Sequence, residues 1–379
     1  THLLWFMGIH GTNTLEAVSR HLFEQNVEIN QSLVLAGHIP TEIFSKTFLD
    51  TFVFIGGCGT ALSFVLALYI ASKQSHNRKM SFVALPSALF NISEIAVFGF
   101  PIIFNLTMLI PFILTPVILT LISASAIKTG LVPAVTQSVE WTIPILLSGY
   151  QATGSVSGSL LQLFNLLVGV FIYMPFVRRS EKQETGKFKQ AVRQMEQDMA
   201  AGERDGVIPA YLSHKYPYYY YAKTLSMDLT NAMKRGQLQL FYQPQISSQG
   251  ELHGMEALLR WNHPVTGYIA PPVLIRLAHE SGILNELGYS LLDRACLDAQ
   301  AIQNSVSNNI CLSINISPKR LQDPGFFDKT LEIVRQYPLE RIHVVLEITE
   351  RAAMELSAEL KKKMEYMKEQ GLEFSLDDF

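Results

Sequence analysis

The sequence predicts a helical multi-span membrane domain followed by an α/β domain. Two observations support this fold class. Only 17% of the 379 residues are charged, whereas about 25% is usual in soluble proteins, and the charge-poor part of the chain is its first half. In the second half, apolar runs of strand length alternate with helical segments, a pattern typical of parallel βα units. We therefore expect a membrane part and a soluble part in one polypeptide.

Three long runs without charge predict the membrane crossings. Residues 51–72 have the length of one span. Residues 95–127 exceed one crossing and contain three prolines, which predicts a span together with a broken or re-entrant helix. Residues 141–177 form the third run and end at Arg178 and Arg179; basic residues there and after the first run predict cytoplasmic ends. The alternative, a very apolar soluble core, is disfavoured by these basic ends.

Composition restricts the function further. The net charge of −3 provides no basic surface for a nucleic-acid polymer. The cysteines Cys58, Cys296 and Cys311 lack the spacing of metal ligands, and a reducing cytoplasm suits the second half. The chain opens at Thr1 without an initiator methionine or a signal-peptide pattern, so we expect it to begin inside a longer protein.

A charge-dense stretch, residues 178–206, marks the boundary between the two parts. We expect a solvated linker there, and the helical spacing of Phe188, Val192 and Met195 leaves a short helix as the alternative. The second domain is expected to begin with a helix whose N-cap is Ser226. The predicted domains are therefore 1–178, 179–225 and 226–379.

The first candidate site lies in residues 254–261, where Glu256 and Arg260 stand among apolar residues between two turn signals. A strand here sets both charges in a partly dry place, and buried charges are costly unless they are paired or bound to metal. Two interpretations stay open from these residues alone: an ordinary strand with an ion pair at its rim, and a functional site. The turn that follows, at His263, is expected to be structural.

Three later strands each carry an acid or an amide at the end. Asn315 ends the first, Glu347 lies near the end of the second, and Asp377 with Asp378 ends the third. Parallel strand ends meet on one face of a βα barrel, so these side chains and Glu256 are expected to converge. Carboxylates gathered in this way repel one another unless a cation joins them. Their oxygens and the amide oxygen suit Mg²⁺ or Mn²⁺, so the sequence predicts a divalent-metal site.

Five motifs occur in order in the second half of the chain. They are Phe241-Tyr242-Gln243-Pro244, Glu256-Ala257-Leu258 with Arg260 and Trp261, Asn315-Ile316-Ser317, Glu347-Ile348-Thr349-Glu350 and Asp377-Asp378-Phe379. Together, over residues 231–379, they resemble the EAL family of cyclic di-GMP phosphodiesterases. The resemblance implies a TIM-like (β/α) barrel whose acidic residues bind one or two divalent metals. These metals activate a water that opens cyclic di-GMP to the linear pGpG.

The resemblance also implies roles for single residues. The implied metal ligands are Glu256, Asn315, Glu347, Asp377 and Asp378. Among them, Glu256, Asp377 and Asp378 are the implied catalytic residues. Gln243 and Arg260 are implied to bind the dinucleotide, Arg260 at a phosphate, which suits its planar fork of donors. Glu350 is implied to steady a loop of the site.

The end of the chain departs from this family. The family continues after the Asp-Asp-Phe motif with a strand that carries a catalytic lysine and a further strand with a glutamate, and this chain stops at Phe379. We therefore expect an incomplete barrel, hydrolysis of cyclic di-GMP by the full-length protein, and none by this polypeptide alone. The alternative is a binding protein: a cyclic di-GMP sensor, or a sugar transporter that the dinucleotide regulates.

Four motifs stand out in the first half. They are Gly8-Ile9-His10-Gly11, Gly56-Gly57-Cys58-Gly59, Phe90-Asn91-Ile92-Ser93-Glu94 and Phe98-Gly99-Phe100-Pro101-Ile102. Over residues 1–178 they resemble the enzyme IIC membrane subunit of the lactose/cellobiose phosphotransferase system. Glu94 is an acid in apolar surroundings, which in a membrane marks a functional candidate. The resemblance implies that His10 and Glu94 line a sugar pocket, although Ile95 stands where the family has proline and the family's earlier spans are absent.

The sequence thus predicts a membrane-bound, metal-dependent cyclic di-GMP phosphodiesterase coupled to a sugar-permease-like domain. We expect a multi-pass protein of the inner (plasma) membrane with its EAL-like domain in the cytoplasm. The expected partners are cyclic di-GMP, a cellobiose-, chitobiose- or lactose-like sugar, a phosphotransferase-system IIB protein and membrane lipid. Both resemblances suggest a homodimer.

Overall fold

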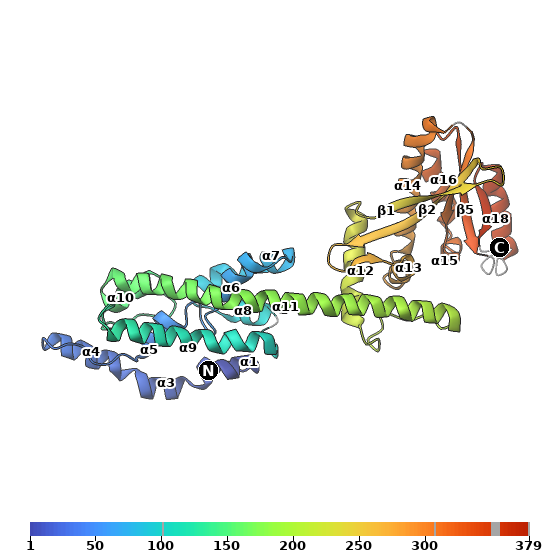
Figure 1. The fold of residues 1–379 in the computed structure, drawn as a ribbon. Helices are drawn as coiled ribbons and strands as arrows, with labels where there is room; N and C mark the ends of the chain where they lie inside the picture. The colour runs from blue at the N-terminus through green and yellow to red at the C-terminus, as the bar shows by residue number, and fades with distance from the viewer. Residues whose placement is uncertain (101, 307, 350–356, 378–379) are drawn as a thin grey trace. The chain divides into compact units, whose positions relative to one another are not determined.

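The computed structural model describes residues 1–379 except 101, 307, 350–356 and 378–379. The backbone alone is described for Arg20, Ser75, Pro318, Thr349, Ala358 and Asp377. The chain divides into two compact units, Thr1–Glu184 (unit 1) and Thr185–Phe379 (unit 2). Unit 1 is helical, and unit 2 combines a sheet with helices (Figure 1).

Unit 1 consists of short helices and two long ones. Its elements are α1 (His2–Phe6), α2 (Gly11–Thr14), α3 (Glu16–Phe23), α4 (Gln25–Leu35), α5 (Lys46–Phe48), the π-helical turn η1 (Leu49–Val53), α6 (Ala61–Ala71), α7 (Ser75–Leu89), α8 (Glu94–Gly99), α9 (Leu106–Lys128), α10 (Leu147–Thr153) and the first part of α11 (Val156–Asp205). The core of the unit includes apolar side chains of α6, α9 and α11.

The run 51–72 does not form the predicted span. η1 is followed by a glycine-rich loop before α6 begins. Gly56, Gly57 and Gly59 have φ angles of +82°, +94° and +67°, which residues with side chains rarely adopt. A Cβ on Gly59 would lie 2.1 Å from a ring atom of Phe112. α6 therefore has only 11 residues, about 16 Å, whereas the hydrocarbon core of a bilayer is ~30 Å thick.

The other two charge-free runs match the prediction in part. The run 95–127 divides into the short α8 and the 23-residue α9, as expected for a broken helix next to a long one. The run 141–177 supplies α10 and the start of α11, but α11 continues beyond Arg178 and Arg179. Within the described part of the chain, α9 and α11 are the two helices that are long and apolar enough to cross a membrane.

Side-chain amides of α11 hydrogen-bond to the irregular backbone of unit 1. Nε2 of Gln162 donates to the Thr51 carbonyl at 2.8 Å, and Nδ2 of Asn165 donates to the next carbonyl of η1 at 2.9 Å. Oε1 of Gln162 accepts from the backbone N–H groups of Leu146 and Gly149 at 2.7 and 2.9 Å. Both amides are buried. Buried backbone groups need partners, so these amides stabilise the turn between α5 and the glycine-rich loop.

Residues 185–205 continue α11, so the expectation of a solvated linker is wrong here. Val192, Met195 and Met199 are buried in a core that includes residues of α12 (Tyr219–Lys234). The helical spacing noted in the sequence was the correct signal, because the charges of this stretch occupy the exposed positions of an amphipathic helix. Ser226 is buried inside α12 and does not cap it, since the helix begins at Tyr219.

Among the described residues, the sheet of unit 2 has six strands. They are β1 (Gln239–Ile246), β2 (Leu252–His263), β3 (Gly267–Ile269), β4 (Ile310–Asn315), β5 (Ile342–Thr349) and β6 (Glu373–Asp377). The strand order is β1-β2-β4-β5-β6, with β3 paired to β2 outside this path. β1 and β3 run antiparallel to β2, whereas β2, β4, β5 and β6 are parallel. The predicted parallel βα units are therefore present.

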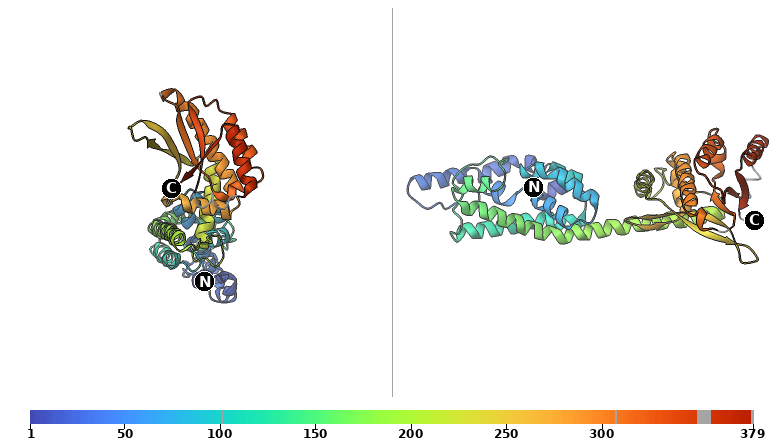
Figure 2. Two further views of the ribbon diagram at one scale, coloured as in Figure 1. Left: turned by 90° about the vertical axis from the view of Figure 1, so that its right-hand side faces the viewer. Right: turned by 90° about the horizontal axis from the view of Figure 1, so that it is seen from above.

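Helices cover one face of this sheet. The helical elements after β3 are α13 (Pro271–Glu280), α14 (Leu284–Ile302), η2 (Gln303–Ser305), α15 (Pro318–Leu321), α16 (Phe326–Arg335) and α18 (Ala358–Glu369). Apolar residues of α14, α16 and α18 form one core with apolar residues of the parallel strands, and these helices lie on the same side of the sheet (Figures 1 and 2). The described strands form an open sheet, and closure into a barrel stays a prediction.

Candidate functional site

The candidate residues of unit 2 share one face of the sheet. Side chains alternate between the two faces along a strand. In β2 the odd-numbered residues 255–263 are buried against the helices, so Glu256 and Arg260 point to the other face. The register between neighbouring strands carries this alternation across the sheet and places Asn315 and Glu347 on the face of Glu256. The sheet therefore has an apolar face under helices and a polar face that carries the acids.

The register also sets the order of the candidates on this face. Glu256 pairs with Ser313, and Asn315, two residues further along β4, pairs with Glu347. Asp377 of β6 lies two residues beyond the partner of Glu347. The acids therefore follow a diagonal across the parallel strands toward their C-terminal ends, where the sequence predicted that they converge.

Asn315 and Glu256 are in direct contact. Nδ2 of Asn315 donates a hydrogen bond of 2.6 Å to Oε1 of Glu256. This bond engages the amide nitrogen, so the amide oxygen is the atom that Asn315 would offer to a cation. A carboxylate and an amide oxygen held together on two adjacent strands fit a hard divalent cation.

Glu347 stands beside Asn315 in a drier place. Its side chain is buried, at 8% exposure, and its backbone carbonyl accepts from the Ile316 N–H at 2.8 Å. Ser375 is its register partner on β6, and the Ser375 hydroxyl is buried without a hydrogen-bond partner among the described residues. Ser375 is not among the residues that the sequence predicted, and its position two residues before Asp377 in the motif strand is the signal that identifies it.

The remaining acids of the site are described incompletely. Asp377 ends β6, whereas Asp378 and Glu350 lie outside the described residues. Among the residues that the structure describes, no three or more His, Cys, Asp or Glu side chains form a group that could hold a metal ion. Glu256 and Glu347 are separated by the strand that carries Asn315, so an amide stands between the two described acids.

The two expected dinucleotide-binding residues flank Glu256. Gln243 is exposed on β1 opposite Glu256. Arg260 lies on β2 on the face of Glu256, and its guanidinium is 6.0 Å from the centroid of the Phe241 ring. Its Nη1 donates to the Leu259 carbonyl at 2.9 Å. Both side chains therefore reach the polar face from the β1–β2 hairpin.

Two further polar groups of unit 2 have structural explanations. His263 is buried, its Nδ1 accepts from the backbone N–H groups of the following turn, and its Nε2 lies 3.2 Å from Asp228, which confirms the structural role expected for it. Burial, and then the nearby Glu373 carboxylate, raise the pKa of the Cys311 thiol. A thiol that stays protonated at neutral pH is a poor nucleophile.

In unit 1 the structure brings the two candidate sugar residues together. Nε2 of His10 lies 3.5 Å from Oε1 of Glu94, and both side chains are partly exposed. Nδ1 of His10 accepts from the Asn13 N–H at the start of α2, and the ring packs 4.3 Å from that of Trp5. His10 is therefore fixed through its backbone-facing nitrogen and presents the other nitrogen to Glu94.

Asn91 lies in the loop before Glu94, and no role for it was predicted from the sequence. Its φ is +61° and its Oδ1 accepts from the Gly56 N–H at 2.7 Å. Its Nδ2 donates to the Ile143 carbonyl at 3.4 Å. Asn91 thus links the glycine-rich loop to the loop that precedes Glu94, and its place inside the Phe90–Glu94 motif is the signal that points to it.

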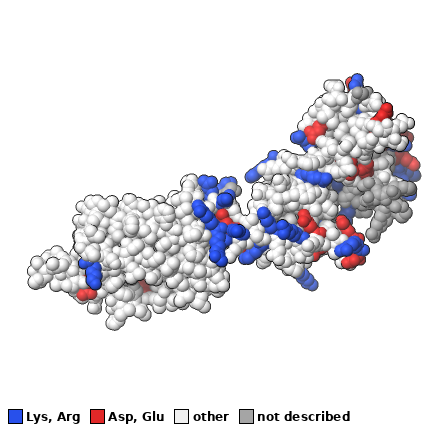
Figure 3. Space-filling model, viewed as in Figure 1, with Lys and Arg blue, Asp and Glu red and all other residues white. Residues whose placement is uncertain are grey.

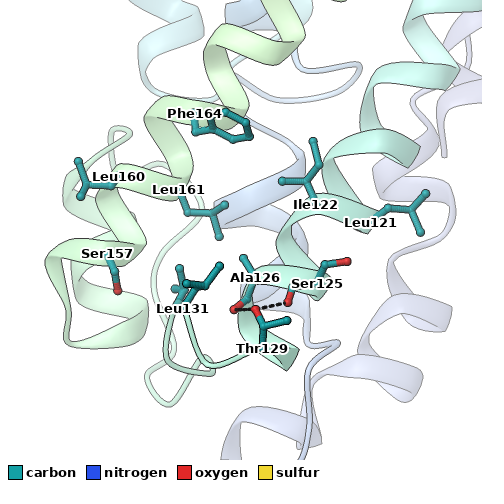
Figure 4. A pocket seen from close by; sticks show the side chains of 11 residues that line it. Leu121, Ile122, Ser125, Ala126, Thr129, Leu131, Ser157, Leu160, Leu161 and Phe164 are labelled. Carbon is teal, nitrogen blue, oxygen red and sulfur yellow. Dashed lines mark hydrogen bonds between the residues drawn. The ribbon is translucent and has the colours of Figure 1, made fainter.

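A separate cavity of about 800 Å³ opens between α9 and α11 (Figure 4). Leu121, Ile122, Leu161 and Phe164 supply much of its wall, and Thr129 bonds to carbonyls of its own helix. Its lining contains no titratable side chain and none of the candidate residues. The cavity therefore offers apolar contacts and no acid–base chemistry.

Charge is distributed differently in the two units. Figure 3 shows a nearly uncharged surface over most of unit 1, with Lys and Arg gathered at one end, and both signs of charge on unit 2. Two segments of unit 1 carry exposed cations: Lys73, Arg78, Lys79, Arg178, Arg179 and Lys182. The backbone N–H of Lys73 donates to Glu181 of α11, which joins the two cationic segments. Cations at the end of an apolar bundle are typical of a membrane boundary.

Comparison with known families agrees with the motifs. Residues 226–379 match the family model of the EAL domain, and residues 1–116 match the family model of the phosphotransferase system, EIIC. The chain therefore combines an EIIC-type region with an EAL domain, and both resemblances in the sequence are confirmed.

The curated relatives divide in the same way. The PTS system oligo-beta-mannoside-specific EIIC component of Bacillus subtilis (strain 168) is 34% identical over 208 residues, which are 54% of this chain and 46% of that protein. The probable cyclic di-GMP phosphodiesterase PdeG of Escherichia coli (strain K12) is 31% identical over 163 residues, which are 43% of this chain and 32% of that protein. The solved structure of the PaMucR phosphodiesterase with c-di-GMP covers 41% of this chain and 64% of its own, at 32% identity and a TM-score of 0.39. The chain spans less than half the length of either curated relative.

Proposed function

We propose that the protein is a membrane-bound, divalent-metal-dependent phosphodiesterase that opens cyclic di-GMP to linear pGpG, and that its EIIC-type region couples this activity to a sugar. The observation that carries the proposal is the contact of Asn315 with Glu256, with Glu347 beside Asn315, on the polar face of a domain that matches the EAL family. A relative named as a probable cyclic di-GMP phosphodiesterase supports the choice of substrate.

Different residues of the polar face have different roles in such a reaction. A divalent cation, Mg²⁺ or Mn²⁺, would be held by Glu256, Asn315 and Glu347 with Asp377 and Asp378. It would lower the pKa of a water, and the hydroxide formed when that water loses a proton would be the nucleophile for the phosphodiester. Asn315 orients Glu256 through its hydrogen bond. Gln243 and Arg260 bind the dinucleotide from the hairpin, Arg260 at a phosphate. Glu350 steadies a loop of the site.

For unit 1 we propose a sugar site at His10 and Glu94. The Glu94 carboxylate can accept hydrogen bonds from sugar hydroxyls, and Nε2 of His10 can donate one, because its Nδ1 already accepts from the Asn13 N–H. The relative that carries the EIIC name is specific for oligo-beta-mannosides, and a cellobiose-, chitobiose- or lactose-like sugar is the chemical class proposed here. A phosphotransferase-system IIB protein as partner and a homodimer belong to the same proposal.

The proposed location is the inner membrane. α9 and α11 have the length and composition of membrane spans, and the exposed cations at one end of unit 1 fit the anionic headgroups of a cytoplasmic leaflet. In this orientation the EAL domain lies in the cytoplasm, where cyclic di-GMP is available. With α9 and α11 as spans, the protein is multi-pass.

The test is hydrolysis of cyclic di-GMP by the full-length gene product in detergent, with Mg²⁺ or Mn²⁺ and pGpG as the product measured. Glu256→Gln should abolish turnover, whereas Glu251→Gln, in the exposed turn of the same hairpin, should leave it intact. Dinucleotide binding without turnover in the unaltered protein would instead indicate a sensor. Failure to bind cyclic di-GMP would refute both.

A further inference from the structure

Arg320 is a buried cation on α15, directly after the strand that carries Asn315. Its residue is 5% exposed, and its guanidinium carbon lies 5.0 Å from the centroid of the Tyr289 ring and 5.1 Å from that of Phe326. Among the described residues, none accepts a hydrogen bond from its Nε or Nη2. Burying a charge is costly, and two aromatic faces together with the nearby Asp323 carboxylate offset part of this cost.

The space for this guanidinium depends on a glycine of α14. A Cβ on Gly288 would lie 2.0 Å from the Cζ of Arg320 and 2.1 Å from its Nη1. Gly288 and Tyr289 belong to α14 and Phe326 to α16, so the one side chain of Arg320 fixes α15 to two longer helices. Burial lowers the pKa of Arg320 to about 10, which leaves the group charged at neutral pH.

A short, hydrogen-bonded path connects Arg320 to the proposed site. Only Ile316 and Ser317 separate Asn315 from the start of α15. The Ile316 N–H is bound to the Glu347 carbonyl of β5 at 2.8 Å, and the Arg320 N–H is bound to the Ser317 carbonyl at 2.9 Å. The segment that leaves Asn315 is therefore held by β5 at one end and by Arg320 at the other.

We propose that Arg320 is a positioning residue for the metal site. Its guanidinium, enclosed by Gly288, Tyr289 and Phe326, anchors α15 and so keeps Asn315 in the orientation in which it contacts Glu256. The inference rests on the proposed function, in which Asn315 and Glu256 are metal ligands.

The test perturbs both sides of this contact. Arg320→Ala removes the anchor, and Gly288→Ala keeps the arginine but forces it out of its space. Alanine favours a helix over glycine by about 1 kcal/mol, so Gly288→Ala should not weaken α14 itself. Arg294→Ala is the matched control, because Arg294 is an exposed arginine of α14, the helix of Gly288. Arg320→Lys tests whether another cation at this position restores the function. The readouts are the affinity for Mn²⁺, by electron paramagnetic resonance, and amide hydrogen exchange of residues 315–321.

We expect Arg320→Ala and Gly288→Ala each to weaken Mn²⁺ binding by about tenfold or more, as supporting residues of metal sites do. Both should speed exchange in residues 315–321, Arg320→Lys should recover part of each loss, and Arg294→Ala should change neither. The double variant should be no worse than Arg320→Ala alone, because Gly288→Ala acts only through the guanidinium.

Three results would overturn the inference. Unchanged exchange in residues 315–321 would show that Arg320 does not hold this segment. Faster exchange with unchanged Mn²⁺ affinity would show that the segment does not position the site. Losses of Mn²⁺ affinity that add in the double variant would show that Gly288→Ala does not act through the Arg320 guanidinium. If the unaltered protein binds no Mn²⁺, the proposed function fails first and the inference falls with it, which distinguishes the two failures.

Discussion

The two units satisfy their polar groups in opposite ways. In unit 1 the backbone is irregular around the glycine-rich loop, and side-chain amides such as those of the buried Gln162 and the partly buried Asn91 supply its hydrogen bonds. In unit 2 the backbone groups pair with one another in the sheet ladder. The side chains of Asn315 and Glu347 therefore do not support the backbone ladder and remain available for a ligand.

This difference separates stability from function. A polar side chain that replaces a missing backbone partner holds the fold, and its loss leaves buried groups unsatisfied. A carboxylate placed among other acids for a cation contributes little to the empty fold, and its loss removes the function instead. Substitution of Gln162 should consequently act on stability, and substitution of Glu347 should act on binding.

The largest expected effect is that of Gln162→Leu in unit 1. The substitution leaves two backbone N–H groups and one carbonyl without partners, at about 1–3 kcal/mol each, so we expect a loss of roughly 4 kcal/mol in stability. The thermal unfolding midpoint of the protein in detergent measures it. Gln31→Leu, on the exposed side of α4, is the control. A midpoint equal to that of the control would mean that these amide bonds are not needed.

The second prediction compares two glycines with positive φ, one in each unit. Gly59→Ala combines a strained φ of +67° with an overlap on the Phe112 ring and should cost about 3 kcal/mol. Gly250→Ala, at φ +83° in the β1–β2 turn with no neighbour within 4 Å of an added Cβ, should cost about 1 kcal/mol. Thermal unfolding of both variants provides the comparison. Equal losses would indicate that packing around the glycine-rich loop adjusts freely.

The third prediction reverses the sign of the stability effect. Glu347→Gln replaces a buried carboxylate by a neutral group of similar shape, so the metal-free protein should be as stable as before or slightly more so. Mn²⁺ affinity should fall at least tenfold, since an anionic ligand is lost. Calorimetric titration measures the affinity, and unfolding in a chelator measures the stability. Marked destabilisation with unchanged Mn²⁺ affinity would show instead that Glu347 stabilises the fold and does not bind the metal.

The same contrast explains what the sequence predicts well. The parallel strands and the shared face of Glu256, Asn315 and Glu347 follow from two-residue alternation and from motif order, which are local properties. The strand register then places these residues close together, so no long-range contact has to be known to predict their common position. Glu350 and Asp378 lie outside the described residues, so the prediction for them stays as the sequence makes it.

The errors of prediction arise where distant residues decide the backbone. The charge-free run 51–72 has the composition of a span, but its backbone is not one continuous helix. Gln162, more than a hundred positions away, donates a hydrogen bond to its Thr51 carbonyl and so stabilises this irregular backbone. Likewise the linker expected in residues 179–225 is partly helical because Val192 and Met195 pack against α12. Hydropathy and charge density measure composition along the chain, so neither can predict contacts between residues that are distant in the sequence.

The smallest predicted effect concerns pH and belongs to unit 2. Burial, and then the cation of Lys319, lower the pKa of His279, whose Nε2 lies 2.7 Å from Nζ of Lys319. A folded pKa below the ordinary value near 6.5 means that folding favours neutral His279. Its contribution to stability is therefore full above about pH 6.5 and is lost as the pH falls through the lowered pKa. His279→Gln should flatten the dependence of the unfolding midpoint on pH between about 7.5 and 5. The same pH dependence in both proteins would assign the acid sensitivity to other groups, and a steeper one in the variant would show that folding favours protonated His279.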